Sequence, residues 1–323
     1  MSLLKLQYET SKAMANTFQR IIKKTLFHEI WDIMVVKSPE PHHFPHNTLD
    51  IIKKTNAVKL TKKYAFQADP FIIARNNKLY IFYEAFNFIT SRGTLRCRTL
   101  NESLAEIDDV KLEGFDDLHC HLSFPFIFYI NDKLFMIPES SERREVILFE
   151  LTEFPARWKK VRTLISGSAL TDNVLLSINE KYYLCSTDMA DNLVIHTASD
   201  LAEPWQQISP ELEVCNHHPR GAGAPHYIDN KIYIVTQECL PGEYGKSVYI
   251  KALQKLTAQH YEESLVDQLS ASVNNSDGIH TLNFSSDVII YDTKHLAFSL
   301  LSPFKKIAYK LITRRRNRRF SSA

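Results

Sequence analysis

The sequence contains no apolar run long enough to cross a membrane, since a transmembrane helix needs about 20 mostly apolar residues. Residues 1–20 lack a continuous apolar segment followed by a small-residue cleavage site, so we expect no secretory signal. The five cysteines are odd in number, scattered and never in a CxxC pair. That pattern favours free thiols in a reducing compartment over a disulfide framework.

Several catalytic motifs are also missing. The 13 histidines show no HExxH spacing, and no CxxC pair accompanies them, so we expect no metal site, with calcium in an axial channel as the alternative. The glycine-containing stretch "RGAGAP" has no GK[ST] and no following helix, which argues against a phosphate-binding loop. There is no nucleophile elbow to support Ser-His-Asp catalysis. Zinc-dependent, P-loop and serine-hydrolase chemistry are therefore all disfavoured.

Acidic residues are absent from one segment. Residues 305–319 contain eight Lys/Arg and no Asp/Glu, although the whole chain has a net charge of only +2. Without this segment the chain has 31 basic and 37 acidic residues. The basic charge therefore belongs to the C-terminal tail, and the rest of the chain is acidic.

What the sequence does contain is a repeated pattern of an apolar or aromatic run, a polar pair, and a second run rich in Tyr, Phe, Ile and Leu. The copies are "DPFIIARNNKLYIFYE" (69–84), "SFPFIFYINDKLFMIPE" (123–139), "TDNVLLSINEKYYLCSTD" (171–188), "GAPHYIDNKIYIVTQE" (223–238) and, more weakly, "TLNFSSDVIIYD" (281–292). Aromatic and β-branched residues on both sides of a polar pair predict a β-hairpin, because Asn and Asp tolerate the left-handed backbone of tight turns. Each predicted hairpin ends in an acid, at Glu84, Glu139, Asp188, Glu238 and Asp292.

The hairpins recur about every 50 residues, which is typical of β-propeller blades. We predict an all-β fold, a five-bladed β-propeller over 49–302; a sandwich with similar hairpins is the alternative. Residues 1–48 are expected to hold an N-terminal helix (4–24), a strand (28–36) and a Pro/His-rich connector. The strand would pair with the last blade and close the ring. Residues 303–323 are predicted to form a basic amphipathic helix.

The same segments, together with "ELTEFPARWKKVRTLISGSAL" and "DGIHTL", resemble the N-terminal module of plant glucosamine inositolphosphorylceramide transferase and its bacterial relatives. The resemblance covers nearly the whole chain and implies a role in carbohydrate chemistry. In the plant enzyme this module precedes a separate glycosyltransferase domain, which this sequence lacks. The hairpins are more distantly similar to five-bladed arabinanase- and xylosidase-type glycosidases, which carry an Asp at the start of the first blade and further carboxylates around one axial pocket.

A propeller brings the starts of its inner strands together on the axis. The residues at these positions are polar or charged: Asp69, His121 with Ser123, Asp172, Arg220 and His280. Glycosyl chemistry needs one carboxylic acid to protonate the leaving oxygen and a second carboxylate as base or charge stabiliser. We assign that work to Asp69, Glu139 and Asp172.

The remaining candidates would bind substrate. Arg220 could clamp an anionic group bidentately, and His121 and His280 could exchange protons near neutral pH. The other members of this set are Glu84, Gln237, Glu238 and Tyr244, next to Gly245. Each residue also has a structural interpretation: a turn for Asp69 and Asp172, a salt bridge from Glu139 to Arg143 or Arg144, and ordinary hydrogen-bonded histidines.

We interpret the chain as an enzyme of surface-glycan assembly that transfers a glycosyl unit. The alternatives are a glycoside hydrolase, a non-catalytic glycan-binding module, or a scaffolding propeller. No cofactor is expected, and a nucleotide sugar is one candidate donor. The tail places Phe304, Ile307, Ala308, Leu311 and Ile312 on one helical face beside basic residues, which is typical of a helix on an anionic membrane surface. We therefore expect a cytoplasmic, peripheral protein at the inner membrane surface that meets a lipid-linked sugar and binds no nucleic acid.

Overall fold

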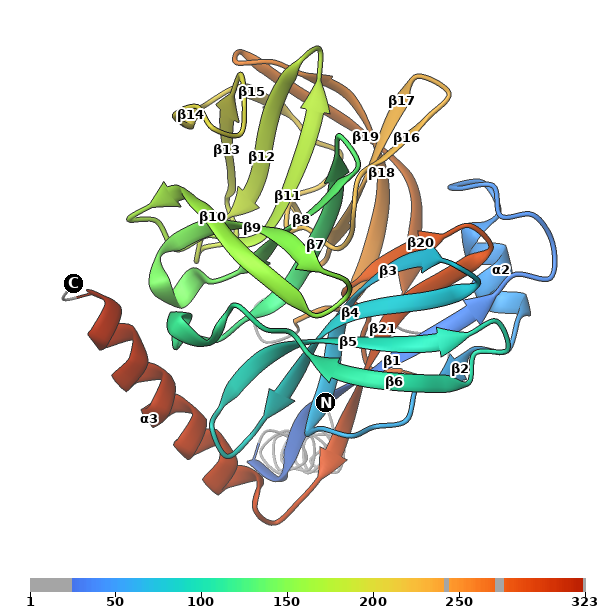
Figure 1. Cartoon of the computed structure of the whole chain (residues 1–323), viewed down its shortest axis with the longest axis vertical. Helices are drawn as coiled ribbons and strands as arrows, with labels where there is room; N and C mark the ends of the chain where they lie inside the picture. The colour runs from blue at the N-terminus through green and yellow to red at the C-terminus, as the bar shows by residue number, and fades with distance from the viewer. Residues whose placement is uncertain (1–24, 241–243, 271–275, 322–323) are drawn as a thin grey trace, which may run out of the picture.

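The computed structural model describes residues 25–240, 244–270 and 276–321, with side chains described as far as 316. Its strands form five sheets arranged around a common centre, antiparallel except for the β15–β19 pair, so the predicted five-bladed β-propeller is confirmed (Figure 1). The helix expected over 4–24 lies outside the described residues. No helix in the described part of the chain is both long and apolar enough to cross a bilayer.

Each blade runs outward from an inner strand. Blade 1 consists of β3 (Phe66–Arg75), β4 (Lys78–Asn87), β5 (Arg92–Asn101) and β6 (Glu106–Lys111). Blade 2 consists of β7 (Ser123–Ile130), β8 (Lys133–Glu139), β9 (Glu145–Glu153) and β10 (Arg157–Ser166). Blade 3 consists of β11 (Thr171–Ile178), β12 (Lys181–Thr187), β13 (Leu193–Ala198) and β14 (Gln206–Ile208).

Blade 4 consists of β16 (His226–Ile228), β17 (Lys231–Gln237), β18 (Ser247–Leu256) and β19 (His260–Ser270), with β15 (Glu211–Glu213) parallel to β19. Blade 5 consists of β20 (Leu282–Ser285), β21 (Val288–Phe298), β1 (Phe27–Lys37) and β2 (Val58–Lys59). The last blade thus combines both ends of the chain, because β1 pairs with β21 along its whole length. The predicted ring closure by the strand over 28–36 is confirmed.

Two α-helices and two short 3-10 helices complete the described chain. They are α2 (Thr48–Lys54), α3 (Ser302–Ser321), η1 (Asp116–Leu118) and η2 (Ser141–Arg143). The C-terminal helix was predicted, whereas α2 was not. A helix of only two turns gives little periodic signal, and this one is stabilised by packing of Leu49, Ile51 and Ile52 into the core beside blades 4 and 5.

The hairpin turns follow the polar pairs. Asn76 and Asn77, between β3 and β4, both have positive φ (51° and 57°), and the pairs in blades 2, 3 and 4 do the same. Positive φ at both central residues is the type I′ geometry that matches strand twist, and Asn and Asp adopt it at low cost. The polar pairs therefore fix the register of each inner hairpin.

A further feature of the inner strands is a β-bulge near the start of β3, β7 and β11. At equivalent positions in these bulges stand Asp69, Phe124 and Asp172, each with positive φ (53°, 42° and 46°). Non-glycine residues in this conformation cost about 1–3 kcal/mol each and cluster at functional sites. Two of the three bulged residues are the aspartates singled out from sequence.

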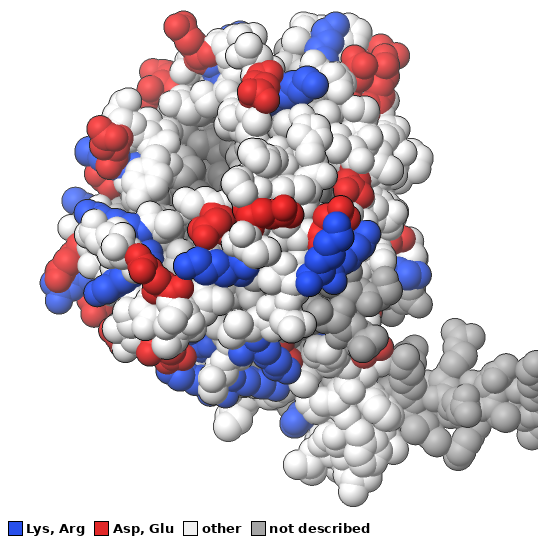
Figure 2. Space-filling model, turned by 90° about the vertical axis from the view of Figure 1, so that its right-hand side faces the viewer, with Lys and Arg blue, Asp and Glu red and all other residues white. Residues whose placement is uncertain are grey.

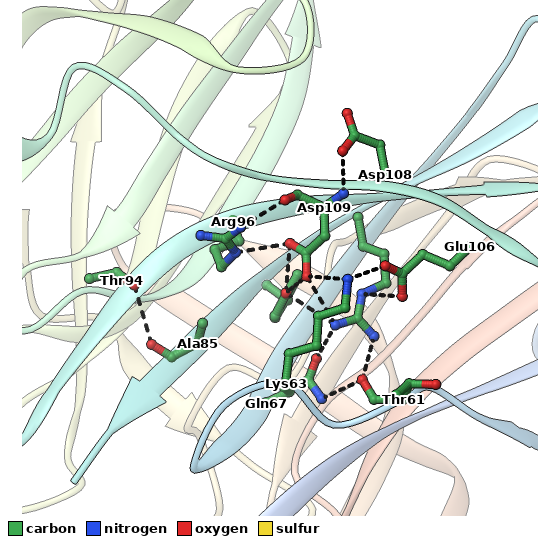
Figure 3. A network of polar contacts seen from close by, with 11 residues as sticks. Thr61, Lys63, Gln67, Ala85, Thr94, Arg96, Glu106, Asp108 and Asp109 are labelled. Atoms are coloured by element: carbon green, nitrogen blue, oxygen red, sulfur yellow. Dashed lines mark hydrogen bonds and ion pairs between the residues drawn. The ribbon is translucent and has the colours of Figure 1, made fainter. Parts of the chain in front are cut away.

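A buried polar network stabilises blade 1 away from the axis (Figure 3). The Arg98 side chain is fully buried and donates hydrogen bonds to Gln67 Oε1, the carbonyl of Thr61 and Asp109 Oδ2. Asp109 also accepts a 2.9 Å hydrogen bond from Arg96 Nε. Burial alone would raise the pKa of Asp109, but hydrogen bonds and charge from Arg96 outweigh it and lower that pKa. The network joins β5 and β6 to β3 and to the segment before it.

The outer surface carries charges of both signs. Figure 2 shows one side of the molecule, on which Asp/Glu and Lys/Arg side chains are interspersed. Because positive and negative side chains alternate on this side, it lacks the uniformly basic surface that would attract a polyanion.

Candidate functional site

Asp69 lies at the bulge of β3 and is buried among hydrogen-bond donors from two other blades. Its Oδ2 accepts a 3.1 Å hydrogen bond from the Phe124 backbone N–H of blade 2. Its Oδ1 accepts a 3.0 Å bond from the Thr281 hydroxyl of blade 5 and lies 3.4 Å from His280 Nε2. Burial raises the pKa of Asp69 to about 6; the charges of Asp292 and Asp172 add to this, and His280 opposes it.

His280 and Asp292 form a buried ion pair beside Asp69. The His280 Nδ1 lies 2.6 Å from Asp292 Oδ2, and Asp292 also accepts hydrogen bonds from the backbone N–H groups of Asp69, His280 and Thr281. The imidazole stacks on Trp31 with 3.8 Å between ring centroids. Burial lowers the pKa of His280, but Asp292 and Asp69 outweigh it and raise that pKa. The protonated form of the imidazole is therefore favoured beside Asp69 and Asp292.

The three ligand atoms offered by Asp69, His280 and Asp292 lie within 4.8 Å of one another, a spacing that could hold a metal ion. Each of the three side chains already bonds the others or neighbouring donors. The polar atoms of the cluster are therefore engaged by hydrogen bonds and ion pairs within the protein.

A second ion pair joins blade 3 to blade 4. Arg220 donates through Nε to Asp172 Oδ2, and its guanidinium lies 5.0 Å from the centroid of the Tyr244 ring. Tyr244 also contacts His280 edge-on at 5.3 Å, so the aromatic ring connects the two ion pairs. Burial lowers the pKa of Arg220, but the charge of Asp172 more than offsets it and raises that pKa, so the guanidinium stays protonated.

Two further acids are buried at the ends of β4 and β8, and no Lys or Arg contact holds either of them in the described chain. Glu139 accepts a 2.8 Å hydrogen bond from the Ser141 hydroxyl. Burial raises the pKa of Glu139 to about 8, and the charge of Asp172 adds to this while Arg220 opposes it. Burial, with the charges of Asp69 and Glu139, raises the pKa of Glu84 far above its ordinary value. Both groups are therefore protonated or nearly so at neutral pH.

His121 lies beside Glu84, with 3.5 Å between His121 Nε2 and Glu84 Oε1. The Nδ1 atom accepts a 2.9 Å hydrogen bond from the Gly93 N–H, which leaves the proton of the neutral ring on Nε2. Burial lowers the pKa of His121 to about 4, so the ring is neutral near pH 7. It faces the Oε1 of Glu84, which makes no hydrogen bond in the described structure.

The structure thus brings residues from all five blades to one centre: Asp69 and Glu84, His121 and Glu139, Asp172, Arg220 and Tyr244, and His280 with Asp292. Their pKa shifts are coupled, since the charge of Asp172 acts on Asp69, Glu84, Glu139 and His280. A set of carboxyl groups coupled in this way behaves as a single titrating unit.

Other predicted residues have structural contacts. Gln237 is buried and donates a 3.0 Å hydrogen bond to the carbonyl of Gly221. Glu238 lies 3.9 Å from His218 Nε2. Gly245 has φ +59°, and a Cβ there would lie 2.7 Å from the Trp31 ring, so close packing on Trp31 requires glycine. Ser123 pairs with Glu139 across β7 and β8.

Arg143 and Arg144, the two arginines that the sequence offered as salt-bridge partners of Glu139, contact other groups. Arg143 Nε lies 2.6 Å from Glu145, and Arg144 donates to the carbonyl of Gly167. Arg220 is held by Asp172, and its Nη1 lies 3.5 Å from Asp191 Oδ1. From the sequence, Asp292 was identified only as the acid at the end of a predicted hairpin. Trp31 was not identified as a residue of the site. Trp31 belongs to β1, far from the repeats in sequence, and reaches the centre only because β1 completes blade 5.

Fold and site together define a five-bladed propeller with a buried acidic centre on its axis. Such propellers occur among glycoside hydrolases. This fold is similar to that of an exo-β-1,3-galactanase from Phanerochaete chrysosporium (TM-score 0.51, 10% identity, 80% of this chain and 64% of that chain). It is also similar to the catalytic domain of a GH62 α-L-arabinofuranosidase from Coprinopsis cinerea (TM-score 0.50, 13% identity, 68% and 78%). At these identities the similarity concerns the fold.

Residues 44–284 match the family described as glucosamine inositolphosphorylceramide transferase 1, N-terminal, and the chain belongs to this family. It is 27% identical over 212 residues to the transferase of Oryza sativa subsp. japonica, and 28% identical over 217 residues to that of Arabidopsis thaliana. Each alignment covers 61% of this chain but only 27% of the plant protein. The chain therefore corresponds to about a quarter of each plant relative.

Proposed function

We propose that this propeller carries out glycosyl transfer at its axial centre. The observation that supports this most strongly is the difference in pKa between two buried carboxyl groups. The pKa of Asp69 is about 6, and that of Glu139 is about 8. Different pKa values in one site assign acid and base roles, because at neutral pH one group holds a proton and the other has mostly lost it. Glu139 would donate its proton to the leaving oxygen, and Asp69 would act as base or stabilise the sugar cation.

The other residues would position the substrate. Asp172 keeps Arg220 in place, and Asp191 Oδ1 lies 3.5 Å from its Nη1, so an anionic group such as a phosphate would bind the guanidinium in competition with Asp191. The buried Glu84 Oε1 has no hydrogen-bond partner, and a sugar hydroxyl that entered the centre would supply one beside the neutral His121. A nucleotide sugar fits this set as donor substrate, because it combines phosphate and sugar. We propose no bound cofactor.

One observation favours a second function, that of a non-catalytic glycan-binding module. Asp69 and Asp172 are both engaged with buried cations, His280 and Arg220, as expected of structural carboxylates. The chain also matches only a quarter of the plant transferases. In this case the centre would recognise a sugar while another domain or protein performed the transfer.

The test is incubation of the full chain with a panel of nucleotide sugars and lipid-linked acceptors. We expect product from the wild type and a loss of about 10²–10⁴-fold in rate for Asp69→Asn and Glu139→Gln, the scale of lost acid–base catalysis. Glu153→Gln, on the exposed end of β9, is the matched control and should keep full activity. Equal product from all variants would refute the assigned roles. Sugar binding without product would favour the binding module, and release of free sugar from oligosaccharides would favour a hydrolase.

A further inference from the structure

The outward side of α3 presents a stripe of large apolar side chains. Phe304, Ile307 and Leu311 are 69%, 57% and 55% exposed, and their spacing of three and four residues places them on one helical face. Leu300 and Leu301, just before the helix, are exposed as well. These five residues are called the α3 stripe below. Elsewhere in the described chain, exposed large apolar residues are scattered among the strands and loops.

The opposite side of α3 is fixed to the propeller. Near its start, the Ser302 hydroxyl lies 2.8 Å from His28 Nδ1, and Lys305 Nζ lies 4.8 Å from the centroid of the Phe88 ring. Near its other end, Arg316 forms 2.8 Å contacts with Glu142 Oε1 and the carbonyl of Ser91. Anchors at both ends hold the helix in one orientation beside the propeller (Figure 1), and the residues of the α3 stripe remain exposed.

These anchors place α3 on the same face of the propeller as the candidate site. Ser91 follows β4, whose end carries Glu84, and Glu142 follows β8, whose end carries Glu139. Glu142 also accepts a 2.8 Å hydrogen bond from the His121 backbone N–H. Tyr309 of α3 lies close enough for the charges of Glu142 and Glu84 to add to the effect of burial in raising its pKa.

Basic side chains flank the α3 stripe on the exposed side. Lys310, Arg314 and Arg315 are all exposed, and the segment from 305 to 319 contains no acid. An apolar stripe flanked by cations matches the boundary of an anionic bilayer, where apolar side chains enter the acyl region and basic side chains meet the headgroups. We propose that α3 docks on an anionic membrane surface, with its axis in the membrane plane and the α3 stripe inserted.

Docking through α3 would bring the candidate site to the membrane surface, because both lie on one face. A substrate anchored in the same bilayer could then reach the centre without leaving it. If the proposed function holds, we infer that the acceptor is a lipid-linked sugar at the inner leaflet; this part of the inference rests on that function. The docking itself does not depend on that function and is measured without any sugar.

The test is co-sedimentation of the full chain with vesicles of phosphatidylcholine alone or mixed with an equal amount of phosphatidylserine. We expect binding to the anionic vesicles, weaker at high salt. Phe304→Ser with Ile307→Ser and Leu311→Ser should weaken binding by about 100-fold, because three inserted apolar side chains are lost. Arg314→Gln with Arg315→Gln should weaken binding to anionic vesicles by about 30-fold.

The matched control replaces three apolar residues of similar exposure on outer strands, Ile107→Ser, Val161→Ser and Leu265→Ser, and should bind like the wild type. The arginine variant leaves the apolar surface intact, so it still tests the proposal if the serine variant folds poorly. Vesicle binding that is unchanged in both the serine variant and the arginine variant of α3 would overturn the proposal. So would a wild-type dimer that the serine variant abolishes, or RNA binding without vesicle binding. If the chain binds vesicles but glycosylates no acceptor, the membrane-docking proposal is retained and the proposed lipid-linked acceptor is rejected.

Discussion

We expect Asp292→Ala to lower the free energy of unfolding by about 4 kcal/mol, the largest stability loss we foresee for one substitution in this protein. The carboxylate is fully buried and accepts from three backbone N–H groups in addition to pairing with His280. Alanine would leave these donors without a partner and strand the imidazole charge next to Asp69. Urea denaturation followed by tryptophan fluorescence measures the change, since Trp31 stacks on His280.

Asp117→Ala is the control, because Asp117 is exposed in η1 and such substitutions usually change stability by less than about 0.5 kcal/mol. A stability loss for Asp292→Ala as small as that of the control would show that the Asp69–His280–Asp292 cluster does not support blade 5.

The second large effect concerns the ion pair between blades 3 and 4. Arg220→Met should cost about 3–5 kcal/mol at pH 7, because the buried Asp172 carboxylate loses its cation. The penalty requires an ionised buried carboxylate, so it should be smaller over the acid range, where carboxyl groups become protonated, than at pH 7. Unfolding free energies measured across this range for wild type and variant give the difference directly.

The double variant Arg220→Met with Asp172→Asn removes the stranded charge and should recover part of the stability lost at pH 7. A penalty that stays constant with pH and is not relieved by Asp172→Asn would mean that packing of the Arg220 side chain, and not its charge, matters at this position.

The sequence predicts the propeller well because each blade repeats a local signal. The polar pair of each inner hairpin, such as Asn76-Asn77, must adopt positive φ, and the adjoining runs favour strands, so turn and strand signals agree. The pairing of β1 with β21 was predicted from a β-type segment preceding the repeats. Neither α2 nor the inner-strand bulges could be predicted, because α2 depends on packing and a bulge depends on register against a neighbouring strand.

The sequence predicted which residues lie at the candidate site better than it predicted which of them pair with one another. A repeat aligns residues such as Asp69 and Asp172 at the starts of inner strands, so their convergence follows from the fold. Which groups pair across the axis depends on side-chain geometry that no local pattern encodes. For that reason the pairing of Arg220 with Asp172, and the lack of a Lys or Arg salt bridge to Glu139 among the described residues, emerged only from the structure.

The most direct test of a single coupled centre is the pKa of the Glu139 carboxyl, measured by carbon-detected NMR titration in the wild type and in Asp172→Asn. We predict a value of about 8 in the wild type. In the variant it should fall, because the negative charge of Asp172 is gone and Arg220 is free to stabilise the ionised Glu139. An ordinary glutamate pKa that is identical in both proteins would contradict the convergence of these side chains on one axis.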